Sequence, residues 1–157
     1  MPSRVNYMKS APDVFQSMLA LHTATRKSRL SPELLDLIDY HVSQINACAF
    51  CLDMHSKDLR ARGVTEQKLY MISAWREAHD LYSSRERAAL AWAEAVTRLV
   101  DHQVPDVVYD QARAEFSENE LVELTLSIIS INGWNRLNIA FHTPAGDYKS
   151  NIKPPAV

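Results

Sequence analysis

Signals that start a helix recur along the whole chain. Ser83 with Glu86 and Ser117 with Glu120 have the spacing of a capping box, in which each side chain bonds the backbone N–H of the other residue. Only 3 glycines occur in 157 residues, which is too few for a turn-rich all-β fold or for a phosphate-cradling loop. The sequence therefore predicts an all-α, single-domain bundle of several helices.

Apolar residues at helical spacing follow each of these signals. The predicted helices start at or near Pro12, Ser31, Ala49, Thr65, Ser83, Pro105 and Ser117, and Gly63 is expected to close the helix that starts near Ala49. The helix opened by Thr65 is expected to carry Leu69, Ile72 and Trp75 on its apolar side. The chain after His142 is rich in Pro, Gly and polar residues, so we expect a helical domain over 1–147 and a surface or loose tail over 148–157.

Composition excludes several classes of function. A formal net charge of -2 with no basic surplus argues against a nucleic-acid partner. No stretch approaches the ~18 uninterrupted apolar residues of a membrane span. The start MPSRVNYMKSAPD lacks the apolar core of a signal peptide, which favours the cytoplasm, where thiols are kept reduced.

The only two cysteines, Cys48 and Cys51, form a CxxC motif, and His55 follows four residues after the second. On a helix, positions three and four apart are neighbours, so the two thiols and the imidazole share one face. The partial positive charge of a helix start stabilises a thiolate, and His55 can accept the thiol proton. If the preceding helix folds back, Asp36 reaches the same pocket, and the thiolate, imidazole and carboxylate form a short proton relay.

A thiolate of this kind attacks a peroxide oxygen and becomes a sulfenic acid, which the second cysteine converts to a disulfide that an external dithiol reduces. We expect Cys51 to attack, because His55 lies beside it, and Cys48 to resolve, although Cys48 is nearer the helix N-terminus. Zinc is a rival interpretation, with Cys48, Cys51 and His55 as ligands and Asp36 or Asp53 as a fourth. Two inert buried cysteines, and a solvated Asp36, are the remaining alternatives.

Two further features are expected to be structural. Trp134, Asn135 and Arg136 form a polar and aromatic cluster in the last helix, which we expect to provide packing and a buried ion pair, with a wall of the thiol pocket or of the subunit interface as the alternative. His22, on the first predicted helix, is expected to be a surface histidine rather than part of that pocket.

The segment LIDYHVSQINACAFCLDMHSKDLRARG resembles the alkylhydroperoxidase D-like branch of the carboxymuconolactone decarboxylase superfamily. That family has a glutamate twelve residues before the CxxC motif and a histidine after it. Cys48, Cys51 and His55 match, whereas Asp36 stands at the glutamate position and is one methylene shorter. Phe50 stands where some members have a histidine. The resemblance extends through LYMISAWREAHDLYSSRERAALAWAEAVTRL and INGWNRLNIAF, from about Arg4 to Asp147.

The resemblance implies an all-helical fold whose subunits form homotrimers or homohexamers. It implies a peroxidase that reduces hydroperoxides through Cys51 and Cys48 with the help of His55 and Asp36, without metal, flavin, haem or nucleotide. The reductant would be a lipoyl-bearing or thioredoxin-like dithiol protein. Two alternatives stay open: a lactone decarboxylase like the superfamily's namesake, which needs no CxxC, and a zinc-binding or redox-sensing protein without turnover.

Overall fold

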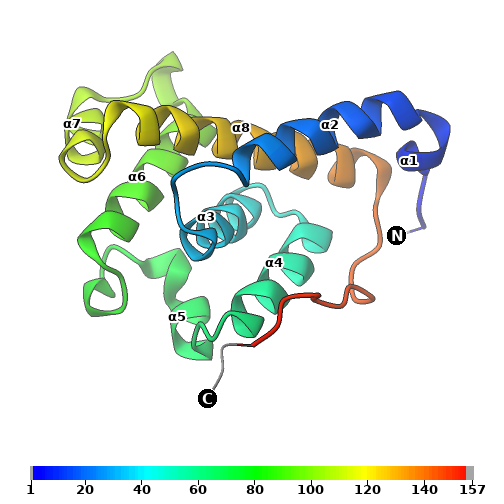
Figure 1. The fold of residues 1–157 in the computed structure, drawn as a ribbon, viewed down its shortest axis with the longest axis horizontal. Helices are drawn as coiled ribbons and strands as arrows, with labels where there is room; N and C mark the ends of the chain where they lie inside the picture. Colours follow the sequence, from blue (N-terminus) through cyan, green and yellow to red (C-terminus); the bar gives the residue numbers. More distant parts are fainter. Residues whose placement is uncertain (1, 155–157) are drawn as a thin grey trace.

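The computed structural model describes residues 2–154, apart from the side chain of His79. This part of the chain is α-helical without a strand, which confirms the all-α prediction (Figure 1). The α-helices are α1 (Tyr7–Ser10), α2 (Pro12–Thr25), α3 (Pro32–Ile45), α4 (Ala49–Ala61), α5 (Glu66–Met71), α6 (Ser84–Arg98), α7 (Asp106–Glu115) and α8 (Glu118–Phe141). Short 3-10 helices span Ile72–Ala74, His79–Leu81 and Val100–His102.

The predicted helix starts are found where the capping residues stand. Both capping boxes form, since the Ser83 and Ser117 side chains accept from the backbone of Glu86 and Glu120, whose carboxylates accept from the serine N–H in return. Gly63 follows α4 with a φ of 90°, a left-handed conformation that favours glycine. Local signals thus account for the starts of α6 and α8 and for the end of α4.

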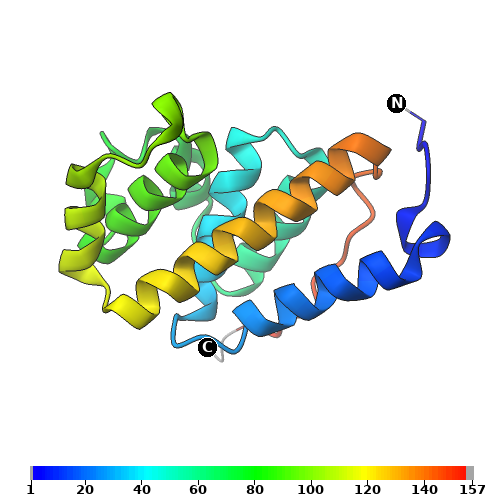
Figure 2. The same cartoon turned by 90° about the horizontal axis from the view of Figure 1, so that it is seen from above.

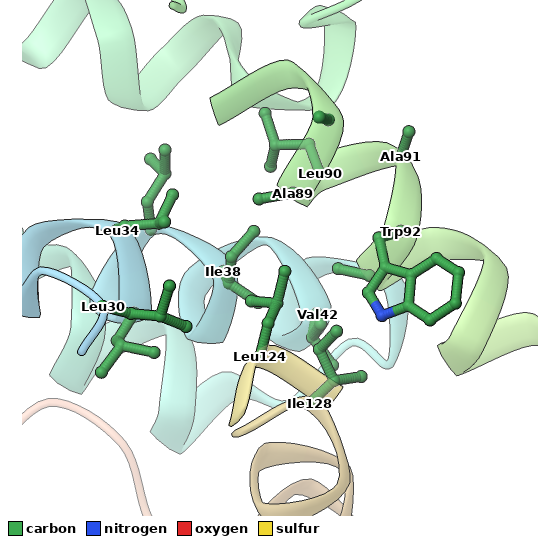
Figure 3. Packing of buried hydrophobic residues seen from close by; sticks show 14 of the residues in the cluster. Leu30, Leu34, Ile38, Val42, Ala89, Leu90, Ala91, Trp92, Leu124 and Ile128 are labelled. Atoms are coloured by element: carbon green, nitrogen blue, oxygen red, sulfur yellow. The ribbon is translucent and has the colours of Figure 1, made fainter. Parts of the chain in front are cut away.

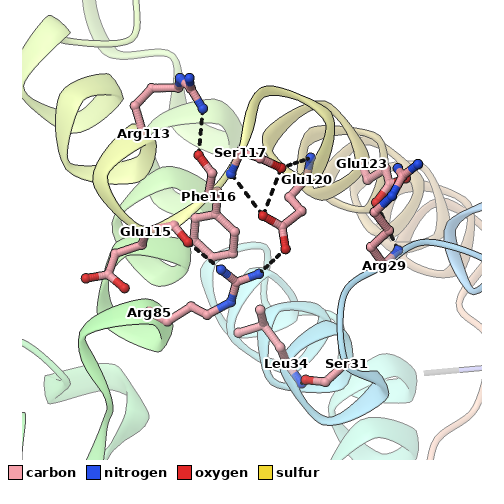
Figure 4. Close-up of polar contacts among 10 residues, drawn as sticks. All are labelled: Arg29, Ser31, Leu34, Arg85, Arg113, Glu115, Phe116, Ser117, Glu120 and Glu123. Atoms are coloured by element: carbon pink, nitrogen blue, oxygen red, sulfur yellow. Dashed lines mark hydrogen bonds and ion pairs between the residues drawn. The ribbon is translucent and has the colours of Figure 1, made fainter.

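One capping box also joins three helices. Arg85 on α6 donates to Glu120 Oε1 at 2.6 Å and to the backbone carbonyl of Glu115, while Arg113 donates to the carbonyl of Phe116 at 2.6 Å (Figure 4). These bonds hold the start of α6 against the junction of α7 and α8. They satisfy carbonyls at the end of α7 that have no partner within the helix.

Two elements differ from the sequence prediction. The helix opened by Thr65 ends at Met71 and tightens into a 3-10 turn, which carries Trp75 into the core with its ring N–H donating to Glu94 at 3.0 Å. The short helix α1 was not predicted; its cap is Asn6, whose side chain accepts from the backbone N–H of Lys9 at 3.2 Å.

The core lies where α3, α6 and α8 meet. Ile38 and Val42 of α3 face Leu90 of α6 and Leu124 and Ile128 of α8, and all five are fully buried (Figure 3). Each such side chain contributes about 2 kcal/mol by leaving water. This packing makes α3 the central helix, with α4 on its other side (Figure 1).

The N-terminal helices form a separate layer. Helix α2 packs against α8, and α1 lies at the N-terminal end of α2, beside the C-terminal end of α8 (Figures 1 and 2). Gly133 permits a close approach here, since a Cβ at this position would lie 2.9 Å from Met18 Cε. The space between this layer and α4 is where the candidate site lies.

The chain after α8 returns along α4. Lys57 Nζ donates to the carbonyls of Gly146 and Tyr148, each at 2.9 Å, and the Tyr148 hydroxyl donates to Asp58 Oδ1 at 3.0 Å. The predicted domain boundary after residue 147 stays a prediction, and residues 155–157 of the predicted tail lie outside the described residues. None of the helices within residues 2–154 combines the length and apolar character needed to cross a membrane.

Candidate active site

The two cysteines lie at the first turn of α4. Cys48 is the N-cap residue, in an extended conformation, and Cys51 lies within the first turn. Their sulfur atoms form a disulfide, with the Cα atoms 5.4 Å apart. Both side chains are buried at the end of the helix where backbone N–H groups lack helical partners and create a partial positive charge.

A tight turn places this helix start against α8. Ala47 has a positive φ of 55°, and this left-handed residue reverses the chain between α3 and α4. Asn46 fixes the turn by donating to the side-chain oxygens of Asn132 and Asn135 on α8, each at 2.9 Å. Asn135 is fully buried and also donates to Ser43 on α3 at 3.0 Å, so its predicted packing role is confirmed. The predicted buried ion pair is wrong, because Arg136 is exposed and donates to Asn132 at 2.8 Å.

A cavity of about 190 Å³ opens beside the disulfide. Its lining is largely apolar and comes from α1, α2, α3, α4 and α8: Tyr7, Met8, Phe15, His22, Thr25, Asp39, Phe50, Cys51, Met54, His55, Ser127, Ser130, Ile131, Trp134 and Asn138. Cys51 therefore faces the cavity, whereas Cys48 is not part of the lining. Trp134 forms part of the wall, the alternative that the sequence left open for this residue.

His55 lies one turn after Cys51 and is 3% exposed. Neither ring nitrogen has a hydrogen-bond partner in the described structure. Burial lowers the pKa of His55 to about 3; Asp36 opposes this effect, and Arg26 adds to it. The imidazole is consequently neutral at neutral pH and can accept a proton or a hydrogen bond.

Two carboxylates on α3 come close to this imidazole. Asp36, Asp39 and His55 each place a possible ligand atom within 4.8 Å of the other two. Arg26 donates to Asp36 Oδ1 at 2.7 Å and also pairs with Asp39, while Arg62 Nε donates to Asp36 Oδ2 at 2.5 Å. Both oxygens of Asp36 are thus held by guanidinium groups, and this side chain is neither solvated nor hydrogen-bonded to His55.

Asp39, which the sequence analysis missed, is the carboxylate that lines the cavity. Burial raises its pKa to about 7; Arg26 lowers it, and the neighbouring Asp36 raises it further. The signal was present in the sequence, because Asp39 follows Asp36 by three residues and shares its face of a largely apolar helix. His22 was also misjudged: it lines the cavity, and burial lowers its pKa.

The zinc alternative is not assembled among the described residues. The cysteines are joined to each other, and the possible ligand cluster of Asp36, Asp39 and His55 contains neither of them. Asp53 pairs with Lys57 at 2.8 Å and accepts from the Gly146 backbone at 3.1 Å, away from the thiols. Arg26 and Arg62 further oppose a cation at the two buried carboxylates.

Comparison with known proteins identifies the family of this chain. The profile of the carboxymuconolactone decarboxylase family matches residues 12–95, which include the CxxC motif. The uncharacterized protein YdfG of Bacillus subtilis is 41% identical over 140 residues, which are 89% of this chain and 95% of YdfG.

Solved structures agree with this assignment. A protein of unknown function from Agrobacterium tumefaciens, suggested to be the antioxidant defence protein AhpD, superposes with a TM-score of 0.89 at 38% identity, covering 94% of this chain and 100% of that one. The debrominase Bmp8 shares the fold, with a TM-score of 0.76 at 24% identity over 89% of this chain and 75% of Bmp8. The chain thus belongs to the carboxymuconolactone decarboxylase family, in its AhpD-like branch.

Proposed function

We propose that this protein reduces organic hydroperoxides through a dithiol–disulfide cycle of Cys51 and Cys48. The observation that carries the proposal is the position of Cys51, which is paired with Cys48 and faces a largely apolar cavity. His55 lies one turn away, and neither of its ring nitrogens has a hydrogen-bond partner among the described residues, so it is placed to take the thiol proton as a base. The family assignment agrees with it, since the Agrobacterium relative has been suggested to act in antioxidant defence.

The chemistry follows from these parts. In the reduced protein, Cys51 gives its proton to His55, and the thiolate attacks the outer oxygen of the hydroperoxide. The O–O bond breaks, the sulfur is oxidised to sulfenic acid, and the alkoxide takes the proton from His55 and leaves as an alcohol. The Cys48 thiol then attacks the sulfenic sulfur, which releases water and forms the disulfide seen in the structure.

Asp36 is expected to act on the reaction indirectly. Its oxygens are occupied by Arg26 and Arg62, so it acts on His55 through its charge, which favours the protonated imidazole. Asp39 lines the cavity and is the carboxyl group beside His55 that can hold a proton near neutral pH. The proton relay predicted from sequence is thus proposed here with Asp39 as an added member.

A complete cycle needs a reductant and involves the assembled protein. We propose a lipoyl-bearing or thioredoxin-like dithiol protein, which would take the disulfide through a mixed disulfide. We also propose that subunits form trimers or hexamers. Val122, Leu126 and Ile129 support this, because they form an exposed apolar stripe at helical spacing on α8.

Thiol counting after one equivalent of cumene hydroperoxide tests the function. The reduced protein should lose both thiols and two mass units, Cys48→Ser should trap a sulfenic acid at Cys51, and Cys51→Ser should not react. Ser17→Ala, on the exposed side of α2, is a matched control that should behave as the parent. Survival of both thiols in the reduced parent would refute the peroxidase.

The aromatic part of the cavity favours a second candidate, the reductive removal of bromine from a small aromatic ring. Phe15 and Trp134 meet edge to face there, with centroids 5.9 Å apart, and Phe50 lies in the same lining. Bmp8 is a debrominase whose structure has been solved with tribromopyrrole. The dithiol would supply two electrons, giving the disulfide, the debrominated ring and HBr. Thiol loss with tribromopyrrole but not with hydroperoxide would favour this activity.

A lactone decarboxylase, the other predicted alternative, has less support. That reaction needs no dithiol, and the CxxC pair would then have no part in it. Alkylation of the reduced protein with iodoacetamide distinguishes the two activities, since it should abolish a thiol-dependent activity and leave a decarboxylase active.

A further inference from the structure

Asn138 on α8 is a polar side chain in direct contact with the sulfur that faces the cavity. Its Nδ2 donates to Cys51 Sγ at 3.5 Å, and the side chain is 4% exposed. Its Oδ1 accepts from the Tyr7 hydroxyl at 3.0 Å. Because Tyr7 holds the oxygen end of the amide, the NH₂ end is directed at the sulfur.

The surroundings of Cys51 make such a donor important. A thiol buried among apolar side chains has a raised pKa, and its thiolate needs compensating charge or donors. The titratable and charged groups around this cavity are His55 from α4, Asp39 from α3, His22 from α2 and Tyr7 from α1, with Arg26 and Asp36 behind Asp39. The residues that α8 contributes to the lining do not titrate, so the Asn138 amide offers its donor at any pH.

We propose that Asn138 is a catalytic residue that stabilises the Cys51 thiolate and that Tyr7 is the positioning residue that orients its amide. When Cys51 loses its proton to His55, the negative sulfur keeps the bond from Asn138 Nδ2. The same bond helps when a reductant thiolate attacks Cys48. The new S–S bond joins the reductant to Cys48, and the Cys48–Cys51 bond breaks with its electron pair on Cys51. The role of Asn138 in turnover rests on the proposed function, whereas its stabilisation of the Cys51 thiolate does not.

The titration of Cys51 alone tests this proposal. In a Cys48→Ser background, each reduced protein is alkylated with iodoacetamide at pH 5 to 10. The dependence of the alkylation rate on pH gives the midpoint, which is the pH at which half of the Cys51 thiol is ionised. A hydrogen bond to a charged group stabilises it enough for Asn138→Leu to raise the midpoint by about one pH unit, with about tenfold slower alkylation below it. Tyr7→Phe should raise the midpoint by a smaller amount, since the amide stays but is free to turn.

Asn119→Leu is the matched control, because Asn119 is an exposed asparagine in the first turn of the same helix and does not line the cavity. It should leave the midpoint unchanged. A folded Asn138→Leu protein with the parent's midpoint would overturn the proposal. If Asn138→Leu does not fold, Tyr7→Phe decides, and an unchanged midpoint there overturns it equally.

Hydroperoxide consumption by the same variants with Cys48 restored separates the two proposals. A parent that consumes no hydroperoxide, together with a raised midpoint in Asn138→Leu, refutes the peroxidase and supports the thiolate contact. A parent that is active, together with an unchanged midpoint, overturns the contact and supports the peroxidase.

Discussion

Asp39 and His55 lie close together in the candidate site and respond to pH in opposite ways. The pKa of Asp39 rises from 3.8 to about 7 on folding, so between these values the folded protein binds more protons, and stability falls as the pH rises. The pKa of His55 falls from 6.5 to about 3, so the unfolded chain binds more protons there, and stability is lost as the pH falls below 6.5. At about 1.4 kcal/mol per pH unit, the two full contributions are about 4 and about 5 kcal/mol.

These two contributions nearly cancel between about pH 4 and 6.5 in the parent protein. Asp39→Asn removes the Asp39 contribution and leaves that of His55. When the pH falls by about 2.5 units, the free energy of unfolding of this variant should therefore fall by about 3 kcal/mol more than that of the parent. His55→Asn leaves only the Asp39 contribution, so over the same fall in pH its free energy of unfolding should rise by about 3 kcal/mol relative to the parent. Arg26 and Asp36, which face both groups, are present in every variant.

The assay is urea unfolding of the oxidised protein, followed by tryptophan fluorescence at a fixed protein concentration and several pH values. Subtracting the parent's free energy of unfolding at each pH removes the contributions of other carboxylates that titrate in acid, such as Glu94. Asp110→Asn, an exposed carboxylate on α7, is the control and should keep the parent's slope. Slopes that change in the same direction for Asp39→Asn and His55→Asn would refute the reasoning.

Leu124→Ala should cost about 3 kcal/mol in urea unfolding because it opens a cavity in the core, whereas Val107→Ala, at an exposed position on α7, should cost little; similar losses would contradict the packing described. Ser117→Ala should cost about 1 kcal/mol through the lost cap of α8, measured as a lower Tm, and an unchanged Tm would contradict it. Ile129→Lys should shift light scattering toward smaller species with unchanged circular dichroism if the stripe on α8 is an interface. Tyr148→Phe should speed proteolysis after α8 without changing thiol reactivity, since it removes the bond to α4.

Local chemistry made most of the fold predictable. The capping residues Ser83 and Ser117 and the closing Gly63 are found at the helix ends where they were expected. The thiol pair was predictable for a similar reason, because Cys48 and Cys51 are three residues apart and so occupy one helical turn. Signals that act within a few residues are independent of how the helices later pack.

The rest of the site depends on contacts between distant segments. Arg26 and Arg62 meet Asp36 only after α2 and α4 have packed against α3, and neither arginine carries a local sign of that role. His22 looked like an ordinary helix-surface residue for the same reason, and its place in the cavity lining comes from tertiary packing. The 3-10 turn before Trp75 likewise follows from the partner that its ring finds on α6.

The layer formed by α1 and α2 has a consequence for how such a protein can diversify. Met8 and Phe15 shape one wall of the cavity from this layer, while Cys48, Cys51 and His55 belong to α4. Part of the selectivity for a molecule is therefore encoded at Met8 and Phe15, which can mutate separately from the cysteines. A protein of this kind can therefore adapt to a new substrate through changes at these two positions and keep its dithiol.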